Sequence, residues 1–230
     1  MKRRSLLAAI ALLAVALPAT AGDVATFVDL GFSPDSAYFM FGQYGVDEAS
    51  GSPYAETYLV DDKRNDFVKD GVARKTFAAK LEPGQDPSGA FYALFADQVP
   101  LAKRYKIDHL LPGRLLYLLL DGQEPPASLS FRDFKTGASY EIALSQKAAE
   151  SGGAVSSSFG LAVTATSKDG ATKRVTGGNP DIKRPGVKEY VIRRIIAAPD
   201  EKTLVFIVEK RMQSKGDSAV RYMVEALKLP

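Results

Sequence analysis

Short apolar runs, broken at regular intervals by turn residues, dominate the chain from residue 22 onward. In one of them Tyr140, Ile142 and Leu144 alternate with polar or small residues, which is the period of a strand with one buried face. Turn signals such as Asp70-Gly71 and Asp169-Gly170 separate these runs. The spacing predicts a mainly β fold of about eleven strands, arranged as a sandwich, a barrel or propeller-like meanders.

One segment departs from this pattern and predicts an amphipathic helical region near residues 87–106. Asp86 can cap the helix, and Pro87 suits its first position, where a missing N–H costs little. Phe91 and Leu94 begin an apolar stripe with a spacing of three to four residues. We expect Pro100 to kink this region or to start a second short helix.

Three further segments carry expectations about local structure. The uninterrupted apolar run Leu115–Leu120 predicts a strand buried on both faces. Gln146–Ser158 is rich in Gly, Ser and Ala, which predicts a linker. Gly177–Gly186 is rich in Gly and Pro, which predicts a loop.

The first residues have the three-part pattern of a secretory signal peptide. A basic start, Met1–Arg4, precedes the twelve apolar residues Leu6–Leu17, and Ala19-Thr20-Ala21 forms a small-x-small cleavage site. A spanning helix needs about 20 apolar residues, so this run favours a leader over an anchor. We therefore expect cleavage after Ala21, by the general secretory route rather than the twin-arginine route. The product is expected to be secreted or periplasmic, with no membrane span.

Charge and cysteine content exclude several classes of function. The chain has 30 Lys+Arg and 27 Asp+Glu, and three of its cations lie in the predicted leader, which leaves 27 against 27. A balanced chain of this kind gives no reason to expect a nucleic-acid partner. The absence of cysteine excludes disulfides, thiolate nucleophiles and cysteine-bound metal centres.

The two ends of the chain resemble each other. Phe32–Phe41 aligns with Ala197–Phe206 at an offset of 165 residues, and each copy holds a Pro-Asp turn before an aromatic and aliphatic strand. Tyr58–Val60 aligns with Tyr222–Val224 at an offset of 164 residues. We therefore expect one β-rich domain over residues 22–230, in which terminal meanders at 24–70 and 187–228 pair around a middle section at 71–186.

The two Pro-Asp turns resemble those of TolB-like periplasmic β-propellers, which turn through Ser-Pro-Asp-Gly. The fourth turn residue here is Ser36 or Glu201 instead of Gly. A closed propeller needs at least four blades, so two such turns favour a single sheet system. The layout also resembles a family of predicted secreted bacterial proteins of unknown function, through Gly31–Ser36 and Tyr222–Glu225. That resemblance implies no catalytic residue.

Motifs for catalysis give weak matches. His109, the only histidine, lies just past the predicted helix beside Asp108 and Leu110, which favours a capping or surface role over a catalytic base. Lys135-Thr136-Gly137 matches one motif of serine β-lactamases, but their Ser-x-x-Lys motif is missing, so a hairpin turn is favoured. No phosphate-binding glycine motif is present.

Three clusters each allow a functional and a structural interpretation, and the structural one is favoured in every case. An acidic cluster with interleaved cations allows a calcium loop or a solvated turn. Two basic pairs allow an anionic partner or a solvated sheet face, and an aromatic group allows a ligand platform or core packing. The acidic residues are Asp61, Asp62, Asp66 and Asp70; the basic pairs are Lys183-Arg184 and Arg193-Arg194; the aromatic residues are Tyr38, Phe39, Phe41 and Tyr44.

These observations predict an exported soluble envelope protein that acts as a non-enzymatic binding or interaction module. Its partner would be an unknown protein or a small-molecule ligand. The alternative is a secreted or periplasmic hydrolase with paired carboxylates, which glycosidases hold roughly 5–10 Å apart. No catalytic, cofactor-binding or metal-binding residue is assigned from the sequence.

Overall fold

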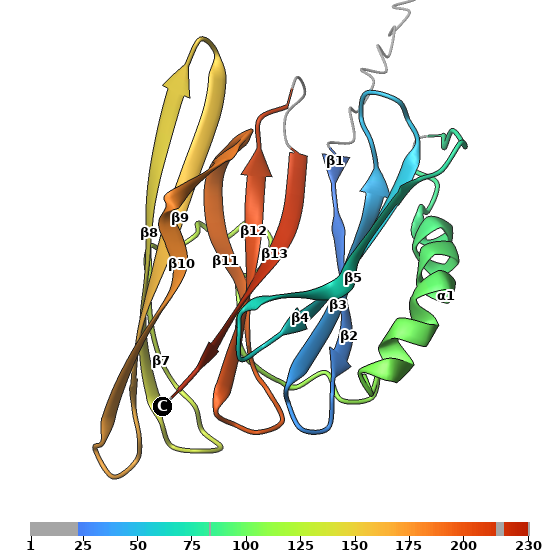
Figure 1. The fold of residues 1–230 in the computed structure, drawn as a ribbon. Helices are drawn as coiled ribbons and strands as arrows, with labels where there is room; N and C mark the ends of the chain where they lie inside the picture. The colour runs from blue at the N-terminus through green and yellow to red at the C-terminus, as the bar shows by residue number, and fades with distance from the viewer. Residues whose placement is uncertain (1–22, 83, 215–218, 230) are drawn as a thin grey trace, which may run out of the picture.

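The computed structural model describes residues 23–82, 84–214 and 219–229 (Figure 1). Over these residues the chain forms thirteen strands and one helix, which confirms the prediction of a mainly β fold with a single helical region. The predicted leader at residues 1–21 lies outside the described residues, as does Gly216-Asp217, whose residue types predict a turn between the last two strands. No helix in the described part of the chain is both long and apolar enough to span a bilayer.

The strands form three sheets. The amino-terminal sheet is antiparallel, in the order β2 (Thr26–Phe32), β3 (Tyr38–Val46), β4 (Pro53–Asp61) and β5 (Asp66–Thr76). The central sheet has the order β1 (Asp23–Val24), β13 (Ala219–Lys228), β12 (Thr203–Met212), β11 (Val187–Ala197) and β6 (Arg114–Leu118), with β1 parallel to β13. The outer sheet is antiparallel, in the order β10 (Thr172–Pro185), β9 (Ala154–Thr166), β8 (Ser139–Ser151) and β7 (Ser128–Arg132).

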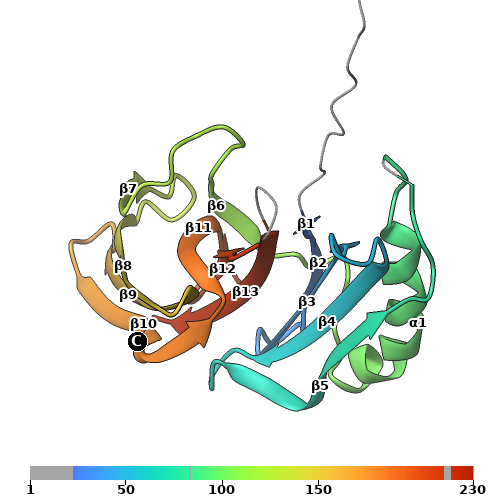
Figure 2. The ribbon, with the colours of Figure 1, turned by 90° about the horizontal axis from the view of Figure 1, so that it is seen from above.

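The sheets stack in layers, and the central sheet is buried on both faces. Leu204, Phe206 and Val208 of β12 pack in the core shared with the outer sheet. Val205 and Ile207, which alternate with them, pack in the core shared with the amino-terminal sheet. Figure 2 shows the central and outer sheets curled around one core, with the amino-terminal sheet on the other side of the central sheet. The period-two side-chain geometry of a strand thus builds two cores from one run of apolar residues.

The helix α1 (Ser88–Arg104) covers the face of the amino-terminal sheet that lies away from the central sheet (Figure 2). Asp86 accepts a hydrogen bond of 2.9 Å from the Ser88 N–H, and the helix runs through Pro100 without interruption. Gly42 of β3 lets it approach, because a Cβ at this position would lie 2.4 Å from Cε2 of Phe91.

Three local predictions are wrong. Leu115–Leu120 is not buried on both faces, because β6 is an edge strand and Leu115 remains 54% exposed. Gln146–Ser158 is not a linker, because β8 and β9 continue through it and are joined by Gly152-Gly153, whose positive φ angles of 59° and 79° suit a two-residue hairpin. Gly177–Gly186 is mostly strand β10, which pairs with β9 on both sides of an irregularity between Asn179 and Arg184.

The repeated turns have the same backbone geometry. Ser33 N–H donates to the Tyr38 carbonyl at 2.9 Å, and at the equivalent place Ala198 N–H donates to the Thr203 carbonyl at 2.8 Å. The fourth turn residues, Ser36 and Glu201, both have a φ of 54°. The meanders that contain these turns lie in different sheets and pack face to face.

Candidate functional site

A small polar hollow lies where the amino-terminal sheet meets β13. Its volume is about 160 Å³, and we call it the Tyr54 hollow. Three strands and the loop after β3 supply its lining, and six of the eight lining side chains carry a charge or a phenol. The lining residues are Asp47, Tyr54, Ala55, Glu56, Arg74, Lys75, Thr76 and Arg221.

Arg221 is held in place on one side of this hollow. Its guanidinium donates to Asp23 Oδ2 at 2.7 Å and to the Asp23 carbonyl at 3.0 Å. The same group lies 4.2 Å from the centre of the Tyr54 ring, which is a close cation–π contact. Burial raises the pKa of Tyr54, so its hydroxyl keeps its proton. That buried hydroxyl makes no hydrogen bond of ordinary length among the described residues, but the Asp23 carboxylate, whose Oδ1 atom is also unpaired, lies near enough to raise the Tyr54 pKa further.

Glu56 lies opposite Arg221 and is fully engaged. It accepts hydrogen bonds from Gln43 Nε2 at 2.5 Å and from the Tyr58 hydroxyl at 2.6 Å, and Arg74 Nε lies 3.5 Å from its other oxygen. Burial, and then the Glu56 carboxylate, raise the pKa of Tyr58 to about 12. Arg74 therefore supplies the counter-charge of Glu56, and Gln43 and Tyr58 donate hydrogen bonds to its carboxylate.

Lys210 of β12 is the cross-strand neighbour of Arg221 in the central sheet. In the strand register it is directly opposite Tyr190 on β11 and directly opposite Arg221 on β13. Cβ atoms of such cross-strand pairs are about 4.5–5.5 Å apart, and like charges at this spacing destabilise a sheet. No hydrogen bond or ion pair of Lys210 occurs within the described residues. Burial lowers the pKa of Lys210, and Arg184, Arg74 and Arg221 lower it further while Glu56 opposes them.

Arg184 of β10 is another cation that acts on Lys210. Its guanidinium lies 5.4 Å from the Phe159 ring centre and 6.0 Å from the Tyr190 ring centre. Its Nη1 atom is buried and has no hydrogen-bond partner in the described part of the chain. The aromatic faces hold the guanidinium in position but leave that donor unused.

These cations outnumber the carboxylates around them. We call Arg74, Arg184, Lys210 and Arg221 the basic cluster; together they carry four positive charges. Asp23 bonds Arg221 and Glu56 pairs with Arg74, which supplies two negative charges and leaves an excess of two. Lys75 and Asp47, which carry opposite charges, also line the hollow. The arrangement therefore combines excess positive charge with unused hydrogen-bond donors.

A second unusual group is Asp62, in the turn after β4. It is only 3% exposed, and neither of its carboxylate oxygens has a hydrogen-bond partner among the described residues. Burial, followed by the charges of Asp61 and Asp200, raises its pKa to about 8, so it is protonated at neutral pH. It borders a hollow of about 440 Å³ that Asn65 and Lys228 also line.

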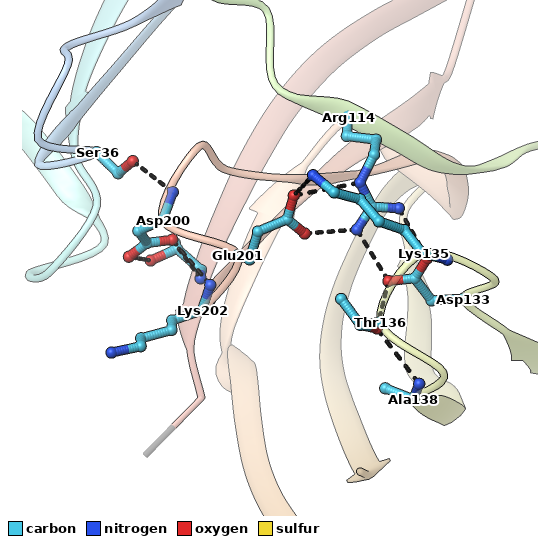
Figure 3. Close-up of polar contacts among 10 residues, drawn as sticks. Ser36, Arg114, Asp133, Lys135, Thr136, Ala138, Asp200, Glu201 and Lys202 are labelled. Carbon is cyan, nitrogen blue, oxygen red and sulfur yellow. Dashed lines mark hydrogen bonds and ion pairs between the residues drawn. The ribbon is translucent and has the colours of Figure 1, made fainter. Parts of the chain in front are cut away.

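A third group ties the central and outer sheets together at their β6 and β7 edges (Figure 3). Arg114 donates two hydrogen bonds of 2.8 Å to Asp133 and one of 2.5 Å to Glu201, which Lys135 also contacts at 2.7 Å. The Arg114 guanidinium lowers the pKa of Asp133 to about 2 and also lowers that of Glu201. Both carboxylates are therefore ionised at neutral pH, and we call this group the Arg114 clamp.

The other motif residues occupy structural positions. His109 Nδ1 lies 2.6 Å from the Leu30 carbonyl, and its ring contacts Phe95 edge-on, so it fixes the segment after α1. Thr136 donates to Asp133 at 2.6 Å in the turn between β7 and β8, where the hairpin was predicted. The four aromatic residues considered as a ligand platform pack instead: Phe39 and Phe41 are buried, Tyr38 contacts Tyr105, and Tyr44 contacts Phe91.

The acidic and basic clusters of the sequence are divided by the fold. Of the four aspartates only Asp61 and Asp62 act on the same site, together with Asp200, while Asp66 and Asp70 are exposed. Within the described ranges no group of three Asp, Glu or His side chains is arranged to hold a metal ion. The basic pairs divide as well: Arg184 turns inward while Lys183 is exposed, and Arg193 pairs with Asp121 while Arg194 stacks on Phe27.

Sequence reasoning missed Tyr54, Arg74, Lys210 and Arg221. One signal was present, because Lys210 continues the alternation of Leu204, Phe206 and Val208 on a buried face of β12. A lysine at such a position is unusual, since charged residues are seldom buried without a partner. The contact between Arg221 and Tyr54 depends on the packing of two sheets, so no local sequence pattern indicates it.

Comparison with known proteins gives one match. A family model described as "Predicted secreted protein (DUF2259)" matches residues 40–228. That range includes Tyr54 and all four residues of the basic cluster. No curated protein and no solved structure matches the chain.

Proposed function

Because the chain belongs to the DUF2259 family of predicted secreted proteins, we propose that it is an exported, non-enzymatic binding module of the cell envelope. The observation that carries this proposal is the Tyr54 hollow, where charged and polar groups from three strands and one loop converge. A few convergent polar groups in a concave site are typical of a ligand-binding site.

The proposal includes the processing and organisation of the chain. Residues 1–21 act as a signal peptide cleaved after Ala21, and residues 22–230 work as one β-rich domain in the periplasm or outside the cell. The likeness of the Pro34-Asp35 and Pro199-Asp200 turns to TolB-like propeller repeats supports a scaffold role for the two meanders. Amino-terminal sequencing of the exported protein tests the cleavage: Gly22 at the start is expected, and an intact Met1 contradicts it.

We favour a small-molecule ligand over a protein partner. Exposed apolar side chains do occur, for example Leu118 on the β6 edge and Phe134 in the turn between β7 and β8, which is 94% exposed. Scattered apolar residues on a surface are normal, however, whereas unused buried donors are rare. The unpaired Tyr54 hydroxyl and the charged groups that line the Tyr54 hollow therefore weigh more than the surface residues.

The binding role is tested by the mass of the folded protein. The protein is purified without denaturant from the envelope of an expressing bacterium, and its mass is measured under native and denaturing conditions. A small-molecule adduct that is present only in the native spectrum is expected. The absence of any adduct, even after incubation with an envelope extract, contradicts the proposal.

One observation favours the alternative function, a hydrolase with paired carboxylates. Asp62, with a pKa of about 8, lies near Asp61 and Asp200, whose charges help to raise that pKa, so a carboxyl that holds its proton at neutral pH has two further carboxyl groups beside it. Glycosidases use such a division of roles. Turnover of cell-wall glycans that is lost in Asp62→Asn, with unchanged circular dichroism, would support this function. Absence of turnover in the wild type removes it.

A further inference from the structure

We propose that Asp62 binds a guanidinium group from outside the chain, carried by a small molecule or by an arginine side chain of a partner protein. The site is the hollow of about 440 Å³ that Asp62 borders, which we call the Asp62 hollow. It lies where the turn after β4 meets β10 and β13. The Asp62 hollow shares no lining residue with the Tyr54 hollow, so the two sites are tested separately.

The other buried carboxyl groups supply the first argument. Five such side chains are buried in the described part of the chain: Asp23, Asp62, Asp133, Glu209 and Glu225. An arginine pairs with three of them, in the pairs Arg221–Asp23, Arg114–Asp133 and Arg211–Glu209. Glu225 accepts hydrogen bonds from Asn65 and from the Gly178 N–H. Asp62 has a partner at neither oxygen among the described residues, although buried polar groups are nearly always paired.

The two unpaired oxygens of Asp62 favour a guanidinium over other cations. A guanidinium presents parallel N–H donors in a planar fork that matches both oxygens of one carboxylate, whereas an ammonium group is a point charge. The Arg114 clamp has this geometry, because Arg114 donates a hydrogen bond of 2.8 Å to each oxygen of Asp133. A guanidinium ligand would satisfy both oxygens of Asp62 in the same way.

The nearby cations of the chain itself do not fill this role. Lys63 and Arg64, in the same turn, are exposed and form no ion pair within the described residues. Lys228 also lines the hollow, but its Nζ lies 4.0 Å from a carboxylate oxygen of Asp200. The negative charges of Asp61 and Asp200 act on the buried carboxyl, so they favour a cation beside it. That cation must therefore come from outside the chain.

The Asp62 hollow has room for a guanidinium and an alkyl stem. Its volume of about 440 Å³ lies within the range of about 300–1,000 Å³ that is typical of ligand pockets. Val175, Ala226 and Leu227 line it together with Asp62, which suits a ligand with a charged head and an apolar stem. Asp62 is only 3% exposed, so its carboxyl turns toward the hollow as the ligand enters. This rotation keeps the hydrogen bond of 3.0 Å from the Asp62 N–H to the Ala37 carbonyl.

The test is calorimetric titration of the full exported protein with two guanidinium probes. One is methylguanidinium chloride, and the other is a pentapeptide with blocked ends and one central arginine. Methylammonium chloride and the same peptide with lysine are the matched controls. We expect each guanidinium probe to bind at least about tenfold more tightly than its ammonium control. The stronger of the two guanidinium probes distinguishes a small-molecule ligand from an arginine of a partner protein.

Binding should also release a proton. Burial raises the pKa of Asp62 to about 8, so the carboxyl is protonated at pH 7 and must ionise to pair with a guanidinium. Titrations at pH 7 in two buffers of different ionisation enthalpy should therefore show release of about one proton for each ligand bound. The affinity should rise about tenfold from pH 6 to pH 7, because the ionised fraction of Asp62 rises by that factor.

Asp62→Asn should abolish both the binding and the proton release. Asp66→Asn, at an exposed position on β5, should behave as wild type. Three results overturn the inference: neither guanidinium probe binds at pH 8, guanidinium and ammonium probes bind equally, or Asp62→Asn binds as tightly as wild type. If Asp62→Asn does not fold, binding to wild type without proton release overturns it instead. Each of these failures leaves the binding role of the Tyr54 hollow intact, because that role is tested by the native mass spectrum.

Discussion

The amide of Asp200 donates a hydrogen bond of 3.0 Å to Ser36 Oγ, which joins the two equivalent Pro-Asp turns of the chain (Figure 3). Ser36 is the fourth residue of the first turn, and Asp200 is the third residue of the second. The two turns therefore meet through a side chain at the position where TolB-like turns carry glycine. This contact links the amino-terminal sheet to the central sheet at the end opposite the Tyr54 hollow.

Ser36→Ala should lower the free energy of unfolding by about 1–2 kcal/mol, because the partly buried Asp200 amide loses its acceptor. Alanine has the same difficulty as serine with a φ of 54°, so backbone strain does not contribute to the difference. Urea denaturation measures the effect. Ser128→Ala, at an exposed position with no described hydrogen bond, is the control, and an equal effect in both variants contradicts the role of the contact.

Arg114→Met should destabilise the protein by about 3 kcal/mol, because it leaves the buried Asp133 carboxylate without its partner. The folded-state pKa of Asp133 is about 2, below its ordinary value of 3.8. The contribution of the clamp is therefore present above pH 4 and is lost as the pH falls toward 2. Acid denaturation curves of wild type and Arg114→Met should converge in that range.

Lys135→Met is the matched variant for the clamp. Lys135 contacts Glu201 at 2.7 Å, but its side chain is mostly exposed, and exposed ion pairs contribute about 0–1 kcal/mol. If Lys135→Met lowers the free energy of unfolding as much as Arg114→Met does, the burial of Asp133 does not explain the stabilising effect of the clamp.

Gly42→Ala should destabilise the protein by about 1–3 kcal/mol, because its methyl group would overlap the Phe91 ring of α1. Gly89→Ala is a useful contrast: it lies in α1 itself, has nothing within 4 Å of its Cβ, and should stabilise by about 0.5–1 kcal/mol. Thermal unfolding followed by circular dichroism measures both. Phe91→Leu should relieve much of the loss in Gly42→Ala, and no relief would mean that the helix does not press on Gly42.

The alternation of apolar residues predicted most strands, because the pleat of a strand is a local property. It did not predict which strand lies in the middle of the molecule. Leu115–Leu120 is more continuously apolar than β12, yet it lies at an edge, since a run of leucines does not specify which strands cover it. Gly152-Gly153 shows the reverse error: two glycines that suit a flexible linker also suit a tight hairpin turn.

The candidate site was not predictable in the same way. Tyr54 and Arg221 are 167 positions apart in the chain (221 − 54) and come together only because two sheets pack face to face. The acidic cluster was visible as a cluster, but the importance of Asp62 alone follows from its burial. Charge balance along the chain hid the local excess at the basic cluster, because its four members lie on four different strands between residues 74 and 221.

Asp62 predicts an unusual dependence of stability on pH. Its folded-state pKa is about 8, and its ordinary value is 3.8, so the folded protein holds this proton more tightly than the unfolded chain. The contribution of Asp62 to stability is therefore complete below pH 4 and falls as the pH rises toward 8. The total loss is on the order of 5 kcal/mol, at about 1.4 kcal/mol for each pKa unit. Asp29, whose pKa burial raises to about 6, adds to the loss only up to that pH.

Between pH 6 and pH 8, Asp62 is thus the dominant contributor to the slope among these groups. Asp62→Asn cannot ionise and should unfold with a free energy that is nearly independent of pH in this range, so that it exceeds the wild type at pH 8. Urea denaturation at pH 6, 7 and 8 measures the slope for both proteins. Asp66→Asn, at an exposed position on the neighbouring strand, should keep the wild-type slope. Equal slopes in wild type and Asp62→Asn would show that the Asp62 carboxyl finds water or a counter-charge in solution.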